Sequence, residues 1–412
     1  MISLQSSLIV VVALAILAWL AASCHVVLVE RRRRGANHLL GHALTTLGAH
    51  GVTHLPLDAR LEQVRPLVAQ ASRELIMRAA ADRDVTDATF DVLIAVIRER
   101  WGLEGLVGDA SEHRSSRDKW RRTAALRILS RCGHPHVFLL LARAADDPDT
   151  DVATSAFSIL GRSSDPRAMD ILFDALRSQR HPASRVAIHI ERSPILIADR
   201  LRTLLDELDP VLRLWGATLL AQYPEPAVEC DLARLTDDTD PRVRKAAIQS
   251  LGRIGDELAA DCAIKLLTDT FPFVRAHAAR ALGELGKTDL AEEVATLLGD
   301  VDWWVRRAAK ESLETMGADV WPVLMRCLSH SDRFVRNGAA EVFQNVGVLD
   351  SLIVMEAASD NPGQNKIVML RQIAEAGGVR FTDSLVERAG PIVGPRIRHL
   401  LAAIGLEHVG AA

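Results

Sequence analysis

The chain has 412 residues, of which 49% are hydrophobic but only 4% are aromatic. This composition favours helices, because strands are enriched in aromatic and β-branched residues. The 53 acidic and 49 basic residues give a net charge of −4, which argues against general nucleic-acid binding. The five cysteines form no Cys-x-x-Cys pair, so neither a disulfide framework nor a zinc site is expected.

An apolar segment lies at the N-terminus. Asp, Glu, Lys and Arg are all missing from positions 1–29, and apolar side chains dominate residues 8–28. As a helix this run would span ~31 Å, about the thickness of the hydrocarbon core of a bilayer. Basic residues follow the run, so the positive-inside bias places the N-terminus outside and the remaining chain in the cytoplasm. We therefore expect residues 1–30 to be a single-pass inner-membrane anchor. Residues 31–35 would be a basic stop beside it, with Arg31, Arg32, Arg33 and Arg34.

Three other interpretations of this segment stay open. A cleavable signal peptide usually carries its positive charges before the apolar run, and here they follow it. A lipoprotein signal would modify Cys24, but the leucine before this cysteine is misplaced and apolar residues continue beyond it. The four arginines could instead be a nucleic-acid patch, although their place directly after the apolar run favours a topological role.

No set of residues in the sequence indicates catalysis or metal binding. Two pairs of histidines have the i, i+4 spacing at which imidazoles on a helix can share a metal, but no acid or cysteine nearby completes either pair. The chain also lacks a Gly-rich phosphate loop and a nucleophile elbow. We therefore expect no metal, no cofactor and no enzymatic activity. The two pairs are His38 with His42 and His50 with His54.

Residues 36–118 are predicted to be N-terminal capping helices. The patterns over 59–80 and 86–101 are helical, but they lack the repeat that dominates the rest of the chain. Such helices would shield the first repeat from water.

A repeated element dominates the C-terminal half. It reads DPRVRKAAIQSLGRIG at 240–255, FPFVRAHAARALGELG at 271–286, DWWVRRAAKESLETMG at 302–317 and DRFVRNGAAEVFQNVG at 332–347. A weaker copy covers 209–222. The hydrophobic-Arg pairs of these copies recur with a fixed period of about 31 residues, which is typical of repeat architectures. Only the last interval is one residue shorter. The arginines of these pairs are Arg213, Arg244, Arg275, Arg306 and Arg336.

Each copy has the signals of one amphipathic helix. Asp240, Asp302 and Asp332 can cap a helix start, and Pro241 and Pro272 suit a first helical turn. Apolar residues recur at helical spacing on one face, and the terminal glycine can adopt the left-handed conformation that ends a helix.

Shorter helices are expected between these copies, over 258–269, 288–300 and 318–330. Each unit is therefore a pair of antiparallel helices, and a stack of such pairs buries a continuous core that one pair cannot.

The Asp-x-x-Val-Arg-x-x-Ala-Ala-x-x-x-Leu-Gly elements resemble the HEAT-like repeat family in its short bacterial form. The resemblance is clear over 209–347 and extends by pattern from 119 to 404, where further second helices are expected. It implies an all-α fold, namely a right-handed α-solenoid of HEAT-like helical hairpins over 119–412, with one N-terminal transmembrane helix. The further second helices would lie near 119–132, 150–161, 183–192, 365–376 and 395–404; the unit around 181–195 departs most.

The resemblance also implies a role for the five arginines of the repeat, which we call the ladder arginines. In the family such residues form a structural ladder by pairing with acids of the adjacent unit. Evenly spaced guanidinium groups could also hold the carboxylates or phosphates of a partner.

The outer flanks of the second helices carry candidate partner-binding residues. In HEAT-like arrays these helices usually line the concave surface, so the flank cations could form a basic groove, although a solvated face is the simpler interpretation. Aromatic residues precede the key Val in three successive units and could anchor a partner or pack between units. The candidates are Arg242, Lys245, Arg253, Arg280, Arg307 and Lys310, with Phe273, Trp304 and Phe334. Trp303 is expected to pack at its helix start.

Together these features predict a membrane-tethered cytoplasmic scaffold or adaptor that binds a protein partner along its concave face. A partner with acidic segments, or the cytoplasmic domain of another membrane protein, suits such a groove. The resemblance adds an association with envelope or polysaccharide machinery. Two other classes stay open: an enzyme similar to the HEAT-like pigment lyases or DNA glycosylases, and a sensor whose repeats respond to a ligand. The sequence does not indicate the oligomeric state.

Overall fold

A computed structural model of the chain describes residues 56–68, 71–82, 85–111, 119–255 and 257–347, and isolated positions beyond residue 347. The expected anchor, the basic stop, Cys24 and the two histidine pairs lie outside the described residues. Only isolated residues of the repeats expected near 365–376 and 395–404 are described. In the described part of the chain, no helix combines the length and the apolar character that crossing a membrane requires.

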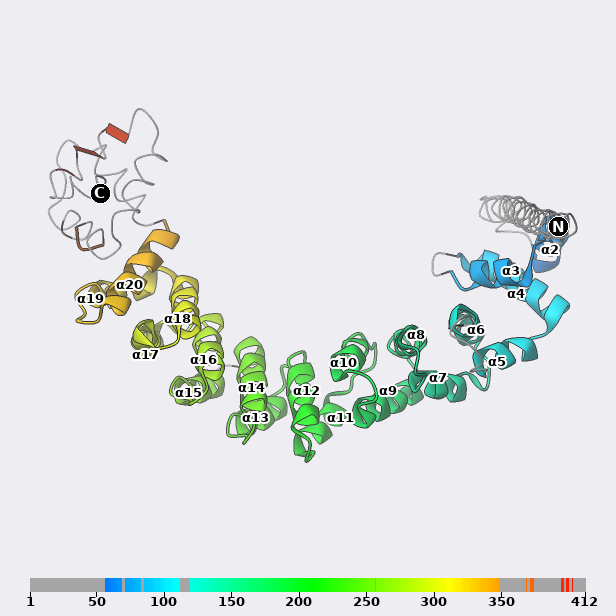
Figure 1. The fold of residues 1–412 in the computed structure, drawn as a ribbon, viewed down its shortest axis with the longest axis horizontal. Helices are drawn as coiled ribbons and strands as arrows, with labels where there is room; N and C mark the ends of the chain where they lie inside the picture. The colour runs from blue at the N-terminus through cyan, green and yellow to red at the C-terminus, as the bar shows by residue number, and fades with distance from the viewer. Residues whose placement is uncertain are drawn as a thin grey trace, which may run out of the picture. The chain divides into compact units, whose positions relative to one another are not determined.

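The chain divides into two compact units between Ile195 and Leu196. Helices account for all the regular secondary structure among the described residues (Figure 1). The first unit contains α2 (Leu57–Val68), α3 (Arg73–Ala80), α4 (Asp87–Trp101), α5 (Glu104–Ser111), α6 (Lys119–Arg131), α7 (Val137–Ala145), α8 (Thr150–Leu160), α9 (Pro166–Ser178) and α10 (Ala183–Glu191). Its helices α6, α8 and α10 confirm the second helices expected there.

The second unit contains α11 (Ala198–Thr203), η2 (Leu204–Asp206), α12 (Pro210–Leu220), α13 (Pro226–Leu235), α14 (Pro241–Ile254), α15 (Glu257–Leu266) and α16 (Pro272–Glu284). It continues with η3 (Thr288–Leu290), α17 (Ala291–Thr296), η4 (Leu297–Gly299), α18 (Trp303–Met316), η5 (Gly317–Val320), α19 (Trp321–Cys327) and α20 (Arg333–Asn345). The long helices α12, α14, α16, α18 and α20 form one row, each packed against the next, and α13, α15, α17 and α19 lie beside that row (Figure 1).

Aspartates start the repeat helices as the sequence predicts. The carboxylate of Asp240 accepts the backbone N–H of Arg242 at 2.8 Å, and Asp302 and Asp332 accept from the residue two positions on in the same way. These caps satisfy backbone donors that the first turn of a helix leaves without partners. The core of each repeat is the apolar stripe that follows, and Val243, Ala247 and Leu251 are all fully buried.

Three local expectations are corrected by the structure. The helical stretch over 59–80 is divided into α2 and α3, because the Ser72 hydroxyl accepts the backbone N–H of Leu75 and caps a new helix. The helices expected over 288–300 and 318–330 are shorter and are flanked by 3-10 turns. Gly255 has φ −88° and is extended, whereas Gly286, Gly317 and Gly347 have the expected positive φ.

Candidate functional site

Close helix contacts create the row formed by α12, α14, α16, α18 and α20. A Cβ atom added to Gly283 of α16 would lie 2.9 Å from Cα of Ser312 on α18, so only glycine permits this approach. The Ser312 hydroxyl donates to the carbonyl of Ala279 at 2.7 Å, and Ser250 donates to Ala217 across the preceding helices at 2.8 Å. The outer flank of this row is therefore held at a defined spacing.

Three ladder arginines form equivalent ion pairs between neighbouring repeats. In each pair, Nε and Nη2 of the arginine donate to the two carboxylate oxygens of an aspartate 25 residues later, over 2.7–3.0 Å. Nη1 donates to the backbone carbonyl six residues before the arginine, at 2.8 Å in each case. We call each such pair a rung. The rungs are Arg213 with Asp238, Arg244 with Asp269, and Arg275 with Asp300.

The rungs are largely shielded from water. The arginine side chains are 13–15% exposed and the aspartates 6–9%. Burial raises the pKa of each aspartate, but hydrogen bonds from the arginine and from a backbone N–H outweigh it, so the net shift is below the ordinary value. The first unit contains a similar pair, Arg122 with Asp147, in which the side chains are 5% and 1% exposed.

The fourth rung is incomplete. Arg306 donates Nη1 to the carbonyls of Asp300 and Val301, at 2.7 and 3.1 Å, as the other ladder arginines do in their loops. The position equivalent to the rung aspartates is occupied by His330, whose Nδ1 accepts the N–H of Asp332 at 3.0 Å. Among the described residues, no carboxylate forms an ion pair with Arg306. Arg336 donates to the carbonyls of His330 and Ser331, both at 2.7 Å.

Most of the candidate flank cations face acids. Arg280 and Arg307 both bind Glu311, at 3.0 and 2.7 Å, and Lys310 pairs with Glu341. Partial burial opposes ionisation of Glu311, but the two arginines hold the pKa of its carboxyl below the usual range. Arg242 binds its own helix-capping Asp240, at 2.7 Å. Lys245 is partly buried and Arg253 is exposed. The flank is therefore a mixed surface of alternating charges.

His277 lies on this flank among cations. Burial, with the positive charges of Lys245 and Arg280, lowers the pKa of His277 from 6.5 to about 4. The imidazole is therefore neutral at neutral pH. No group of three or more metal-ligating side chains is found in the described part of the chain, His277 included.

Exposed aromatic side chains gather at the first turns of α16, α18 and α20. Their exposed fractions range from 39% to 51%, which is high for such large apolar groups. Trp303 is 51% exposed and stacks on Trp304 with ring centroids 3.9 Å apart, and Phe273 lies 5.7 Å from Phe271. We call this set the aromatic edge. It consists of Phe271, Phe273, Trp303, Trp304 and Phe334.

Phe271 was not among the partner-binding residues predicted from the sequence. This residue takes the place at which Asp240, Asp302 and Asp332 cap the other helices, and its side chain caps nothing. The aromatic residue at a helix-cap position was the signal that could have revealed it.

A pocket of about 320 Å³ lies between α18 and α20 beside this edge. Aromatic and charged side chains line it together, and the guanidinium of Arg306 lies 4.5 Å from the ring centroid of Phe334. The pocket therefore offers apolar contact and a hydrogen-bonding cation at the same point. Its lining includes Trp303, Arg306, Arg307, Lys310, Phe334 and Glu341.

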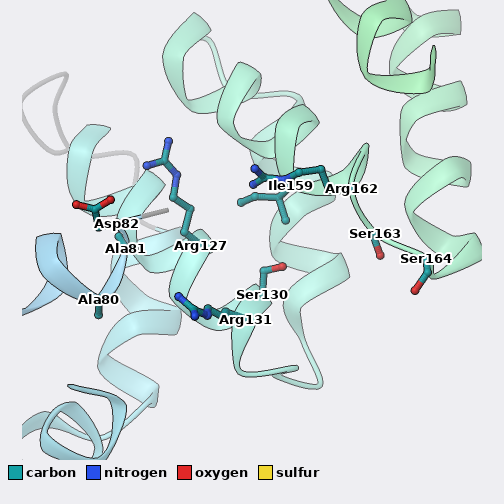
Figure 2. Close-up of a pocket in the computed structure, with 10 residues that line it drawn as sticks. All are labelled: Ala80, Ala81, Asp82, Arg127, Ser130, Arg131, Ile159, Arg162, Ser163 and Ser164. Atoms are coloured by element: carbon teal, nitrogen blue, oxygen red, sulfur yellow. The ribbon is translucent and has the colours of Figure 1, made fainter. Parts of the chain in front are cut away.

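A second pocket, of about 460 Å³, lies in the first unit, where α3, α6 and α8 end (Figure 2). Arg127, Arg131 and Arg162 line it, as do several serines. Arg131 already binds Asp87 at 2.5 Å and stacks on Phe90 at 4.2 Å. The negative ends of helix dipoles also offset the arginine charges here. These residues were not predicted from the sequence, although Arg131 and Arg162 lie 31 residues apart, at the period of the repeat.

Comparison with known proteins supports the repeat architecture. A sequence model of HEAT repeats matches residues 111–189, 198–272 and 263–344, which together cover more than half of the chain. No curated protein sequence matches the chain.

Solved structures with a similar fold were also found. An engineered protein is 18% identical over 90% of this chain and 98% of its own, with a TM-score of 0.35. The complex of CpcE and CpcF of phycocyanin lyase from Nostoc sp. is 19% identical, over 65% of this chain and 94% of its own, with a TM-score of 0.28. The karyopherin Kap121p, bound to the extreme C-terminus of the protein phosphatase Cdc14p, is 15% identical, over 90% of this chain and 48% of its own, with a TM-score of 0.47.

Proposed function

The chain belongs to the HEAT repeat family, and we propose that it functions by binding a protein partner on the outer flank of α16, α18 and α20. The observation that carries this proposal is the aromatic edge. Five large aromatic side chains lie partly exposed on three consecutive repeats, next to guanidinium groups. Tryptophan and arginine are enriched among the residues that dominate binding energy at protein interfaces.

The charges beside the edge suit a protein surface better than a nucleic acid. Glu311 and Glu341 neutralise cations within the flank, so the surface presents both signs of charge. A nucleic-acid interface would need an excess of positive charge, because its affinity comes largely from phosphate contacts. A mixed surface around exposed aromatic groups is the anatomy of a protein interface, with an apolar centre and a polar rim.

Site-specific photocrosslinking in cells tests this proposal. A photoreactive amino acid at Trp304 or Phe273 should capture a defined partner protein. The same group at Glu293, which is exposed on α17 in the other helix row, should capture little of it. With the purified partner, Trp304→Ala should weaken binding about tenfold or more, as expected for an interface hot spot. Equal capture from both helix rows, or unchanged affinity of Trp304→Ala, would refute the proposal.

We further propose that residues 8–28 tether the repeats to the inner membrane, with the repeats in the cytoplasm. The length of the apolar run and the four arginines that follow it support this topology. Tethering would raise the effective concentration of a bound partner at the membrane without new contacts. The full chain should stay in the membrane fraction after alkaline extraction, and a variant lacking residues 1–30 should be soluble. Release of the full chain by alkaline extraction would contradict the tether.

A further inference from the structure

We propose that the incomplete fourth rung is a binding site for a carboxylate of the protein partner. An aspartate or glutamate side chain of the partner would bind Arg306 where the preceding repeats supply their own aspartate. This inference rests on the proposed function, because it names the chemistry that the partner presents to the flank of α18 and α20.

The repeat geometry identifies the missing group. In each complete rung, the aspartate lies six residues before the next ladder arginine, and its Oδ1 accepts the backbone N–H two residues further on. The residue six positions before Arg336 is His330, and its Nδ1 accepts the N–H of Asp332. His330 therefore stands in the structural place of an aspartate. The three corresponding N–H bonds, each of 2.8 Å, join Asp238 to Asp240, Asp269 to Phe271, and Asp300 to Asp302.

His330 cannot replace the aspartate as an acceptor. Because its Nδ1 accepts a backbone N–H, the neutral imidazole carries its proton on Nε2 and can only donate there. The Nε and Nη2 groups of Arg306, which bind a carboxylate in the three complete rungs, have no hydrogen-bond acceptor among the described residues. Two backbone carbonyls nevertheless hold Nη1 of Arg306 in place.

The guanidinium is therefore oriented before any ligand arrives. The planar edge of the guanidinium can donate two parallel hydrogen bonds to the two oxygens of a carboxylate. Because the side chain is already oriented, it loses little conformational entropy on binding. The neighbouring cations do not compete equally for the ligand, because Arg307 already binds Glu311 and Lys310 binds Glu341.

The pocket beside Arg306 adds a second requirement to the partner. Trp303 and Phe334 form aromatic walls next to the guanidinium, and both rings are partly exposed. A partner segment that carries an acidic residue beside an apolar or aromatic one would satisfy the cation and the walls together. A phosphate could also bind a guanidinium, but a rung that is completed elsewhere by aspartate favours a carboxylate.

Peptide selection tests this proposal without a known partner. A random library of linear peptides is selected on the full-length protein and counter-selected on His330→Asp, in which the new carboxylate occupies Arg306. Selected peptides should be enriched in Asp or Glu beside an aromatic or aliphatic residue. In fluorescence polarisation, their affinity should fall about tenfold or more in His330→Asp, in Arg306→Gln, and when the peptide acid is changed to its amide. Circular dichroism checks that both protein variants are folded.

The outcomes separate this inference from the proposed function. Peptides that bind the wild type and His330→Asp equally, but fail to bind Trp304→Ala, would overturn the carboxylate site and leave the binding flank intact. Peptides that bind the wild type, His330→Asp, Arg306→Gln and Trp304→Ala with equal affinity would overturn both the carboxylate site and the proposed binding flank. Selection that yields no acidic enrichment, or no peptide that distinguishes the wild type from His330→Asp, would also overturn the carboxylate site.

Discussion

Arg244 and Asp269 lie 25 residues apart on neighbouring repeats and are joined by two hydrogen bonds, of 2.8 and 3.0 Å. The same arginine donates to the carbonyl of Asp238 in its own loop, at 2.8 Å. The Arg244 side chain thus connects the loop before its own helix to the loop of the next repeat. In a solenoid, stability depends on such interfaces between nearest neighbours.

Removing one side of a rung should destabilise the repeats. Arg244→Ala leaves Asp269 partly buried without its cation, and we expect the free energy of unfolding to fall by about 2 kcal/mol. Arg242→Ala is the matched control, because Arg242 lies on the same helix and binds Asp240 at an exposed position. Urea denaturation should show a clear change for the first variant and little for the second. Equal effects would contradict the structural role of the rung.

Completing the fourth rung should stabilise the protein. His330→Asp places a carboxylate beside Arg306, and we expect the free energy of unfolding to rise by about 1 kcal/mol, because the new hydrogen bonds are charge-assisted. Ser331→Asp is the control, since Ser331 follows Arg306 at the sequence separation of the other rungs but lies outside the structural position of their aspartates. The melting temperatures of the two variants are compared by thermal unfolding. A higher melting temperature for Ser331→Asp than for His330→Asp would show that the assigned register is wrong.

Acid should weaken the fold partly through His277. Its pKa of about 4 in the folded chain lies below the value of 6.5 of a free histidine, so the unfolded chain binds the extra proton first as pH falls. The contribution of His277 is complete above about pH 6.5 and is lost progressively towards pH 4. His277→Asn should show a smaller loss of stability over this range in urea denaturation. Identical pH slopes for the variant and the wild type would contradict the lowered pKa.

The rung aspartates should affect the stability of the fold at lower pH than His277 does. Their folded-state pKa values lie below the ordinary value of 3.8, so their contribution is present above that pH and is lost as pH falls through the folded pKa. Asp269→Asn should therefore be less stable than the wild type at neutral pH, and the difference should shrink below about pH 4. The test is to measure the free energy of unfolding of both proteins above and below this pH. A stability difference that does not change with pH would contradict the lowered pKa of the aspartate.

Gly283 should tolerate no side chain. The Cβ of Gly283→Ala would lie 2.7 Å from the hydroxyl and 2.9 Å from Cα of Ser312, so α16 and α18 would have to separate. We expect a loss of about 1–3 kcal/mol, as for other overpacked contacts. Gly108→Ala on α5 is the control, because in the described part of the chain its added Cβ would meet nothing within 4 Å beyond the backbone of its own helix. Alanine favours a helix over glycine, so this control should unfold at the same or a higher urea concentration.

The sequence predicted the repeat helices because their signals are local. Aspartates before Pro241 and Trp303 cap helices that begin where expected, since a capping side chain binds a backbone group only two residues away. Hydrophobic spacing also predicted the buried face, and Val243 and Leu251 are fully buried. The sequence predicted the extent of the short helices over 288–300 and 318–330 less accurately, because 3-10 turns replace part of the expected α-helix.

The sequence by itself determined the helical repeat, its period and the face that each long helix buries, because these follow from residues within a few turns of one another. Only the tertiary structure decided which charges meet. Arg280 and Glu311 belong to different helices, α16 and α18, yet their side chains lie 3.0 Å apart because successive helices pack side by side. The interval between Arg306 and Arg336 is one residue shorter than the others, so counting 25 residues from Arg306 leads to Ser331, whereas the structure places His330 in the aspartate position. Such contacts depend on the spacing and rotation of neighbouring helices, which are set by packing across repeats.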